Sequence, residues 1–271
     1  MATAAVNAGY AVVAAANVQG SRGCWQTIDV PIVAKALAAW RKKYKKRLPA
    51  AGVSLPLFLL GPSSGGFFAT QYARQERGVS ALSIQVSVPS ARDVMQPLPS
   101  REQTFPPVQM LLMQRDSGKL AESEALLRLQ PPWPGLAHAQ VLRYKPKAVT
   151  PTFFSDGIIG LAPRASSAIR DALVQAGYVN SATSQVVSHP SRGKWREPVL
   201  GALSRFGRES LPQKSLQVAM DSIFARLDLA YAYHASSCEL INATLAFFQQ
   251  HAAAGGGAGA GLGVGRGGHG T

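Results

Sequence analysis

The feature that most constrains this chain is an apolar run that ends in a glycine-rich turn. Val53–Leu60 is apolar almost throughout, Gly61-Pro-Ser-Ser-Gly-Gly66 follows, and Phe67–Gln75 has helical character. Such a run is typical of a strand covered on both faces. The turn matches G-x-S-x-G, in which a strained strand-to-helix turn exposes the serine oxygen. We therefore predict Ser63 as a nucleophile and the N–H of Ser64 as an oxyanion donor. The alternative is a glycine-rich turn in another doubly wound protein.

The segments around this turn alternate between strand and helix patterns. Strands are expected at Gly9–Ala16, Ala81–Val88 and Val108–Met113, and helices from Asp29 to Leu48 and at Ala121–Leu129. Alternation of this kind requires right-handed crossovers and produces a mostly parallel sheet. The fold class is therefore predicted to be α/β.

An activated serine needs a base and an acid that orients the base, and here the acid is sought first. Asp116 follows the strand Val108–Met113 after a short turn, which places its carboxylate on the same edge of the sheet as Ser63. Asp93, which follows the preceding strand, is the rival. Asp116 could equally be a residue that caps the next helix.

The candidate base is a histidine late in the chain, because the order Ser, Asp, His along the chain is one known arrangement of a catalytic triad. His234 lies just before a final helix expected within Ser215–Gln250. A packing role for this histidine among apolar neighbours is the alternative. The other four histidines lie in the insertion, in loops or near the tail: His138, His189, His251 and His269.

The pattern changes after the third of these strands, and four parts are predicted. They are a core with the serine turn (1–145), a mostly helical basic insertion (146–212), a C-terminal helical segment with His234 (213–251) and a disordered Gly/Ala-rich tail (252–271). Within the insertion, helices are expected at Pro163–Ala176 and Glu197–Phe206.

The insertion is read either as a lid over the sheet or as a small winged-helix-like unit that contacts nucleic acid. It contains several basic residues and few acids: Arg164, Arg170, Arg192, Lys194, Arg196, Arg205 and Arg208. Phosphate contacts need such residues. No base-reading motif is visible, so the lid with solvated charges is favoured.

Composition sets the remaining expectations. Lysine and arginine number 28 against 14 acids, a formal net charge of +14. This excess fits either a polyanionic partner or a basic solvated surface. The run Arg41–Arg47 is interpreted as the solvated face of a helix. Cys24 and Cys238 form neither a disulfide framework nor a metal-ligand spacing. We therefore expect a soluble intracellular protein, cytoplasmic or plastid, without a transmembrane segment.

Several motifs together resemble the α/β-hydrolase superfamily, in particular a group found in plants and algae. They are Gly9-Tyr-Ala-Val-Val-Ala, Gly23-Cys-Trp25, Leu-Gly-Pro-Ser-Ser-Gly-Gly66, Pro-Thr-Phe-Phe-Ser-Asp156 and Trp195-Arg-Glu197. The resemblance covers roughly residues 9 to 250. It implies Ser63 as nucleophile, Asp116 as acid and His234 as base. It also implies a small-molecule ester, thioester or amide substrate, with no metal or organic cofactor.

The sequence departs from this superfamily at its N-terminal side. In the superfamily the nucleophile follows the fifth strand, whereas here a single expected strand, Gly9–Ala16, precedes the strand of Ser63. The loop that normally provides a second oxyanion donor has no counterpart, and the strand of Ser63 is expected either to be an unpaired sheet edge or to form a new pairing. A catalytically inactive or truncated hydrolase-fold protein is therefore the alternative to an active hydrolase.

Overall fold

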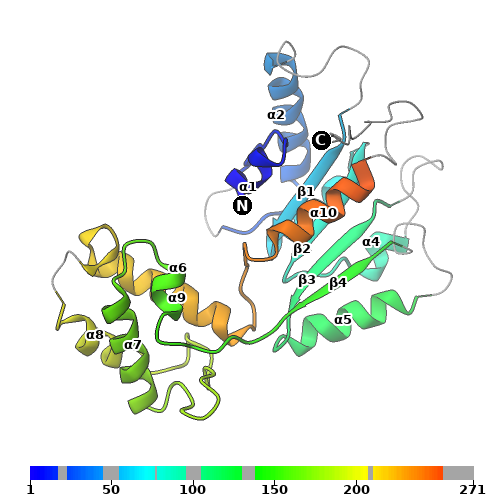
Figure 1. The fold of residues 1–271 in the computed structure, drawn as a ribbon. Helices are drawn as coiled ribbons and strands as arrows, with labels where there is room; N and C mark the ends of the chain where they lie inside the picture. The colour runs from blue at the N-terminus through cyan, green and yellow to red at the C-terminus, as the bar shows by residue number, and fades with distance from the viewer. Residues whose placement is uncertain are drawn as a thin grey trace, which may run out of the picture.

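A four-stranded parallel sheet with the order β1-β2-β3-β4 forms the centre of the computed structural model (Figure 1). The structure describes residues 1–17, 23–44, 55–76, 78–95, 105–129, 138–206 and 210–252. The strands are β1 (Leu57–Pro62), β2 (Val79–Gln85), β3 (Val108–Met113) and β4 (Gln140–Tyr144). This architecture confirms the α/β class.

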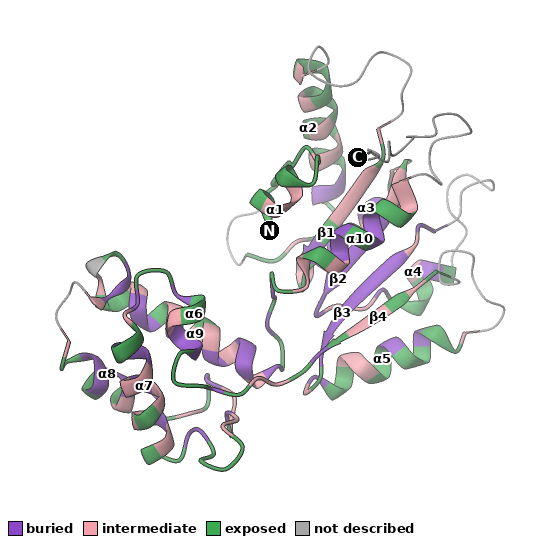
Figure 2. Ribbon diagram, in the orientation of Figure 1, coloured by how far each residue is buried: buried purple, intermediate pink, exposed green. Residues whose placement is uncertain are grey.

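Helices cover both faces of the sheet because the side chains of its central strands are buried on both sides. On β2, Leu82 and Ile84 pack in one cluster with Ala69 and Ala73 of α3, whereas Ala81 packs on the opposite face in a cluster with α10. β3 is buried along its whole length (Figure 2). The covering helices are α3 (Ser64–Gln75), α4 (Ala91–Met95), α5 (Ser117–Leu127) and, on the other face, α10 (Ile241–Ala252).

The face under α10 contains a buried hydrogen-bond network. Gln109 Oε1 accepts from Ser83 Oγ at 3.1 Å and from Thr244 Oγ1 at 2.9 Å, and Gln109 Nε2 donates to Gln140 Oε1 at 2.7 Å. Burying a polar group costs free energy unless the group is hydrogen-bonded, so this network favours one position of α10 on the sheet.

The predicted strand Gly9–Ala16 is wrong. The chain begins with α1 (Ala2–Asn7), and the following segment has no strand assignment. The ring of Tyr10 packs edge-on against Phe58 of β1 at 5.8 Å, while Val12 and Val13 are exposed. An apolar β-branched pattern indicates a strand only where a partner is available. Among the described residues β1 pairs with β2 alone, so the expected edge position of the serine strand is confirmed.

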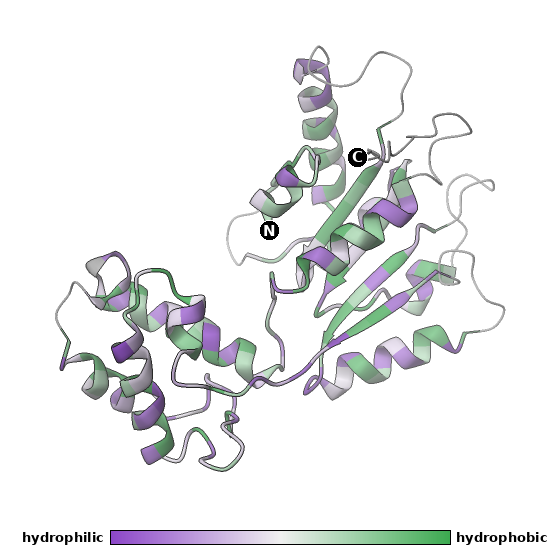
Figure 3. Cartoon of the chain, viewed as in Figure 1, coloured by the Kyte–Doolittle hydropathy of each residue, from purple (hydrophilic) through white to green (hydrophobic). Residues whose placement is uncertain are grey.

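A helix starting at Asp29 was expected and is confirmed as α2 (Asp29–Tyr44). Its inner side packs Val30, Val33 and Leu37 against α3. Arg41–Lys43 are exposed at its far end, which is hydrophilic in Figure 3. The rest of the predicted basic run lies outside the described residues.

A separate helical lobe follows β4, and it lies at the lower left of Figure 1. It contains α6 (Phe153–Gly157), α7 (Pro163–Gln175), α8 (Arg196–Leu203) and α9 (Leu216–Tyr231). One apolar cluster holds these helices together and includes Trp195 and Ile223. Helix α9 therefore packs with the insertion, although the sequence grouped it with the C-terminal segment.

Some boundaries agree with expectation and others do not. β3, α7 and α8 lie where they were expected. The last helix expected within Ser215–Gln250, after His234, is α10, whereas β4 and α9 were not predicted. The predicted disordered tail, apart from Ala252 at the end of α10, lies outside the described residues.

Candidate active site

Ser63 occupies the tight turn between β1 and α3. Its backbone lies at φ 50° and ψ −119°, a conformation that residues other than glycine rarely adopt. The residue is exposed. A Cβ at Gly61 would lie 2.2 Å from the carbonyl oxygen of Gly65, and one at Gly66 would lie 2.7 Å from Ser87 Cβ. Gly61 is therefore required by a close backbone approach and Gly66 by its contact with the Ser87 side chain, and the turn exposes the serine oxygen.

Asp116 is the N-cap of α5 and is 7 % exposed. Its Oδ1 accepts from the backbone N–H of Lys119 at 3.1 Å, so the expected capping role is real. Its Oδ2 lies 3.0 Å from His234 Nδ1. One carboxylate therefore caps a helix with one oxygen and faces the histidine with the other.

His234 lies between Ser63 and Asp116. It follows the end of α9, where Ala232 adopts the left-handed conformation at φ 55°. His234 Nε2 is 3.3 Å from Ser63 Oγ. A carboxylate can only accept, so it favours the tautomer that carries the proton on Nδ1 and leaves Nε2 as acceptor for the serine hydroxyl. The three side chains named from sequence are thus brought together in one chain of contacts.

The rival candidates lie elsewhere. Asp93 in α4 accepts from Ser90 Oγ at 2.7 Å. His138 and His251 are ring neighbours at 5.9 Å, and His189 pairs with Asp228 at 2.9 Å. His269 lies outside the described residues.

The backbone N–H of Ser64, which the sequence predicts as an oxyanion donor, lies at the start of α3. Ser64 is the first residue of α3, so its N–H has no carbonyl within the helix to bond. The indole of Trp25 covers this turn: its Cδ1 and Nε1 would each lie 3.8 Å from a Cβ at Gly65, and its ring packs on Phe68 at 4.4 Å. The Gly23–Trp25 segment therefore lies where it can restrict access to the turn.

Sequence reasoning missed Gln85, the last residue of β2, which contacts both the serine turn and the histidine segment. Its carbonyl accepts from Ser63 N–H at 2.8 Å. Its buried side chain makes two hydrogen bonds to the backbone of Ser237, at 3.0 and 2.9 Å. A glutamine at the end of a mostly apolar strand was the available signal, because such a residue needs partners when buried.

Glu239 fixes the same segment from its other side. Its carboxylate accepts from Tyr144 Oη at 2.6 Å, pairs with Lys147, and lies 3.5 Å from Arg226 of α9. Burial opposes its ionisation, but the Lys147 and Tyr144 hydrogen bonds outweigh burial and hold the pKa of Glu239 below its usual value. Burial, with the bond to Glu239, raises the pKa of Tyr144.

We expect Glu239→Gln to lower the free energy of unfolding by on the order of 1 kcal/mol at pH 7. Because the folded-state pKa is lowered, the carboxylate stabilises the protein above its unfolded-state pKa, and that contribution disappears as pH falls through the folded value. Urea unfolding at pH 7 and at successively lower pH measures this difference and the pH range over which it disappears. Glu122→Gln, at an exposed pair with Lys119, is the control and should have little effect. A Glu239→Gln deficit that persists at low pH would contradict the assignment.

Comparisons of the chain with family models, with curated proteins and with solved structures found no match. Among the described helices, none is both long enough and apolar enough to cross a membrane.

Proposed function

We propose that this protein is a serine hydrolase of the α/β-hydrolase type, acting on an ester, thioester or amide of a small molecule. The observation that supports the proposal is the contact chain from Ser63 Oγ to His234 Nε2 at 3.3 Å and from His234 Nδ1 to Asp116 Oδ2 at 3.0 Å. These residues come from three separate segments of the chain. Their order and roles match the triad arrangement of acyl-transfer enzymes.

In the proposed mechanism, Ser63 Oγ attacks the carbonyl carbon and His234 Nε2 takes the hydroxyl proton. Asp116 stabilises the imidazolium that forms. The negative charge on the former carbonyl oxygen develops near the N–H of Ser64 at the start of α3. Collapse of the intermediate expels the leaving group, which receives the proton from His234. Water then attacks the acyl-serine while His234 Nε2 takes one of its protons. Collapse of this second intermediate breaks the bond to Ser63 Oγ and releases the carboxylic acid, and His234 returns the proton to Oγ.

An activity-based fluorophosphonate probe tests this proposal on the full chain. We expect the wild-type protein to be labelled and Ser63→Ala not to be labelled, because phosphonylation requires the activated oxygen. Ser64→Ala is the matched control. It removes the neighbouring hydroxyl but keeps the backbone N–H, and it should still be labelled. An unlabelled wild type, or labelling of Ser63→Ala at the wild-type rate, would refute the proposal.

A hydrolase-fold protein without turnover is the second candidate, and one observation favours it. β1, which leads into Ser63, is an edge strand of the described sheet, whereas the superfamily places a further strand there with the loop that carries the second oxyanion donor. Loss of one such donor costs about 10²–10³-fold in rate. Slow but Ser63-dependent labelling with no measurable turnover of p-nitrophenyl esters would support this candidate.

A further inference from the structure

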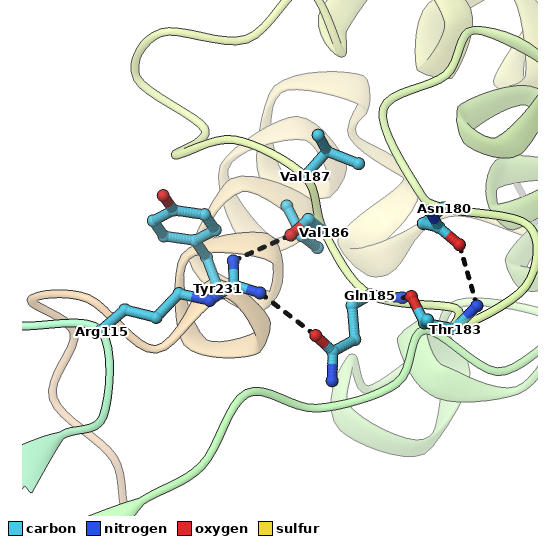
Figure 4. A pocket seen from close by; sticks show the side chains of 7 residues that line it. All are labelled: Arg115, Asn180, Thr183, Gln185, Val186, Val187 and Tyr231. Atoms are coloured by element: carbon cyan, nitrogen blue, oxygen red, sulfur yellow. Dashed lines mark hydrogen bonds between the residues drawn. The ribbon is translucent and has the colours of Figure 1, made fainter.

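An open surface pocket with a cavity volume of about 310 Å³ lies between the helical lobe and the loop that precedes Asp116 (Figure 4). Arg115, which precedes Asp116, forms one wall together with Tyr231 at the end of α9. The opposite wall is the segment from Asn180 to Val187. Ser63 is not among the lining residues, so this cavity is a second candidate site.

The side chain of Arg115 is held in place by neutral partners. One terminal nitrogen donates to the carbonyl of Val186 at 2.9 Å and the other to Gln185 Oε1 at 3.2 Å (Figure 4). Its guanidinium lies 4.4 Å from the ring centroid of Tyr231. None of these partners carries a negative charge, so the positive charge at the cavity wall is not neutralised by them.

The other polar side chains of the wall use their acceptor atoms internally. Asn180 Oδ1 accepts from the N–H groups of Ala182 and Thr183, each at 2.9 Å. Thr183 Oγ1 accepts from Gln185 N–H at 3.4 Å, and Gln185 Oε1 accepts from Arg115. These assignments are unambiguous, since backbone N–H groups and guanidinium can only donate.

What remains on this wall is a set of donors. The hydrogen bonds found between described residues use neither the amide nitrogen of Asn180 nor that of Gln185, and the Thr183 hydroxyl keeps its proton to donate. The lining contains no carboxylate. The carboxylate of Asp228, one turn before Tyr231 on α9, is not part of the lining and pairs with His189 at 2.9 Å.

Backbone pairing within the protein holds the loop that carries these donors. Val179 and Val186 form an antiparallel bridge, as do Ala148 and Gln185. Asn180 lies in the turn between Val179 and Val186, and its side chain accepts two backbone N–H groups of that turn. Donors in a fixed geometry lose little conformational entropy when a ligand binds, which favours affinity.

We infer that this cavity binds an oxyanion, the phosphate or carboxylate group of a small molecule. Arginine with amide and hydroxyl donors fits a ligand that only accepts hydrogen bonds, and the +14 net charge of the chain adds to the attraction. The inference goes beyond the proposed hydrolysis and does not depend on it. The backbone N–H of Arg115 also donates to the carbonyl of Ala232 at 2.9 Å. Because Arg115 and Tyr231 both line the cavity, a ligand here would contact the segments that lead to Asp116 and to His234.

Isothermal titration of the full chain with inorganic phosphate and, separately, with acetate tests this inference. The informative variant is Gln185→Glu, which keeps the acceptor for Arg115 and adds a negative charge to the wall. We expect its affinity for the bound anion to fall by at least ~10-fold, because the added charge lies beside the anion. Gln249→Glu, an exposed residue of α10, is the control with the same change in charge and should bind like the wild type.

The outcomes separate clearly. Binding of phosphate or acetate that Gln185→Glu weakens and Gln249→Glu does not supports the site, and the tighter of the two anions identifies the ligand's group. Thermal unfolding of each variant confirms that it is folded. Absence of binding for both anions, or equal weakening by both substitutions, overturns the inference.

Discussion

Replacing Asp116 with asparagine is expected to lower kcat by about 10⁴-fold for any ester that the protein hydrolyses, with little loss of stability. The reason lies in the two oxygens of the carboxylate. Oδ1 accepts the N–H of Lys119, so an asparagine at this position would keep its oxygen there and turn its amide nitrogen toward His234 Nδ1. That nitrogen donates, which forces the proton of His234 onto Nε2. Ser63 would then face a donor where it needs an acceptor.

Steady-state kinetics with p-nitrophenyl esters measure this effect, and the Ser63 labelling rate provides a second reading. Asp93→Asn is the matched control, because Asp93 also follows a strand of the sheet but bonds to Ser90. It should leave kcat within about twofold of the wild type. If Asp116→Asn kept wild-type kcat, Asp116 would be a helix cap and nothing more.

The second large effect is expected in the helical lobe, where Trp195→Ala should lower the free energy of unfolding by about 3–5 kcal/mol. Trp195 is 1 % exposed, packs in the lobe cluster and lies 6.1 Å from the ring of Phe224. Its Nε1 also donates to the carbonyl of Pro190 at 2.9 Å. Truncation leaves a large cavity and an unpaired carbonyl.

Urea unfolding monitored by circular dichroism measures the loss. Leu200→Ala on the same helix, α8, is the control, because Leu200 is 40 % exposed and its truncation should cost under about 1 kcal/mol. If the lobe unfolds apart from the sheet, the Trp195→Ala transition will be biphasic. A Trp195→Ala loss no larger than that of Leu200→Ala would mean that the lobe does not depend on this cluster.

Local signals in the chain were sufficient for the elements that surround Ser63. Mostly apolar runs predicted β1 to β3, since strands covered on both faces need no regular polar alternation. Glycines at Gly61 and Gly65 predicted the turn. By contrast, β4 reads Gln-Val-Leu-Arg-Tyr, with Gln140 and Arg143 exposed. β4 is the edge strand opposite β1 in the described sheet, and its polar residues interrupt the apolar pattern that predicts a strand.

The failed strand at Gly9–Ala16 shows the opposite error. Its composition favours a strand, but a strand forms only where another strand is available to pair with it, and the composition of one segment does not reveal this. Tyr10 packs on Phe58 instead, and Val12 and Val13 are left exposed. Similarly, the sequence did not identify what Gln85 and Glu239 bond to, because their partners, Ser237 and Tyr144, are distant in sequence.

The sequence by itself determined the residue types and order of the candidate triad and the strand-to-helix turn that holds Ser63. Both are local properties, set by glycines, apolar runs and position after a strand. Only the tertiary structure decided that His234 reaches both Ser63 and Asp116, because α9 packs with the lobe and delivers the histidine to the sheet edge. It also decided that Arg115 faces a cavity lined by donors, since that wall joins segments that only the fold brings together.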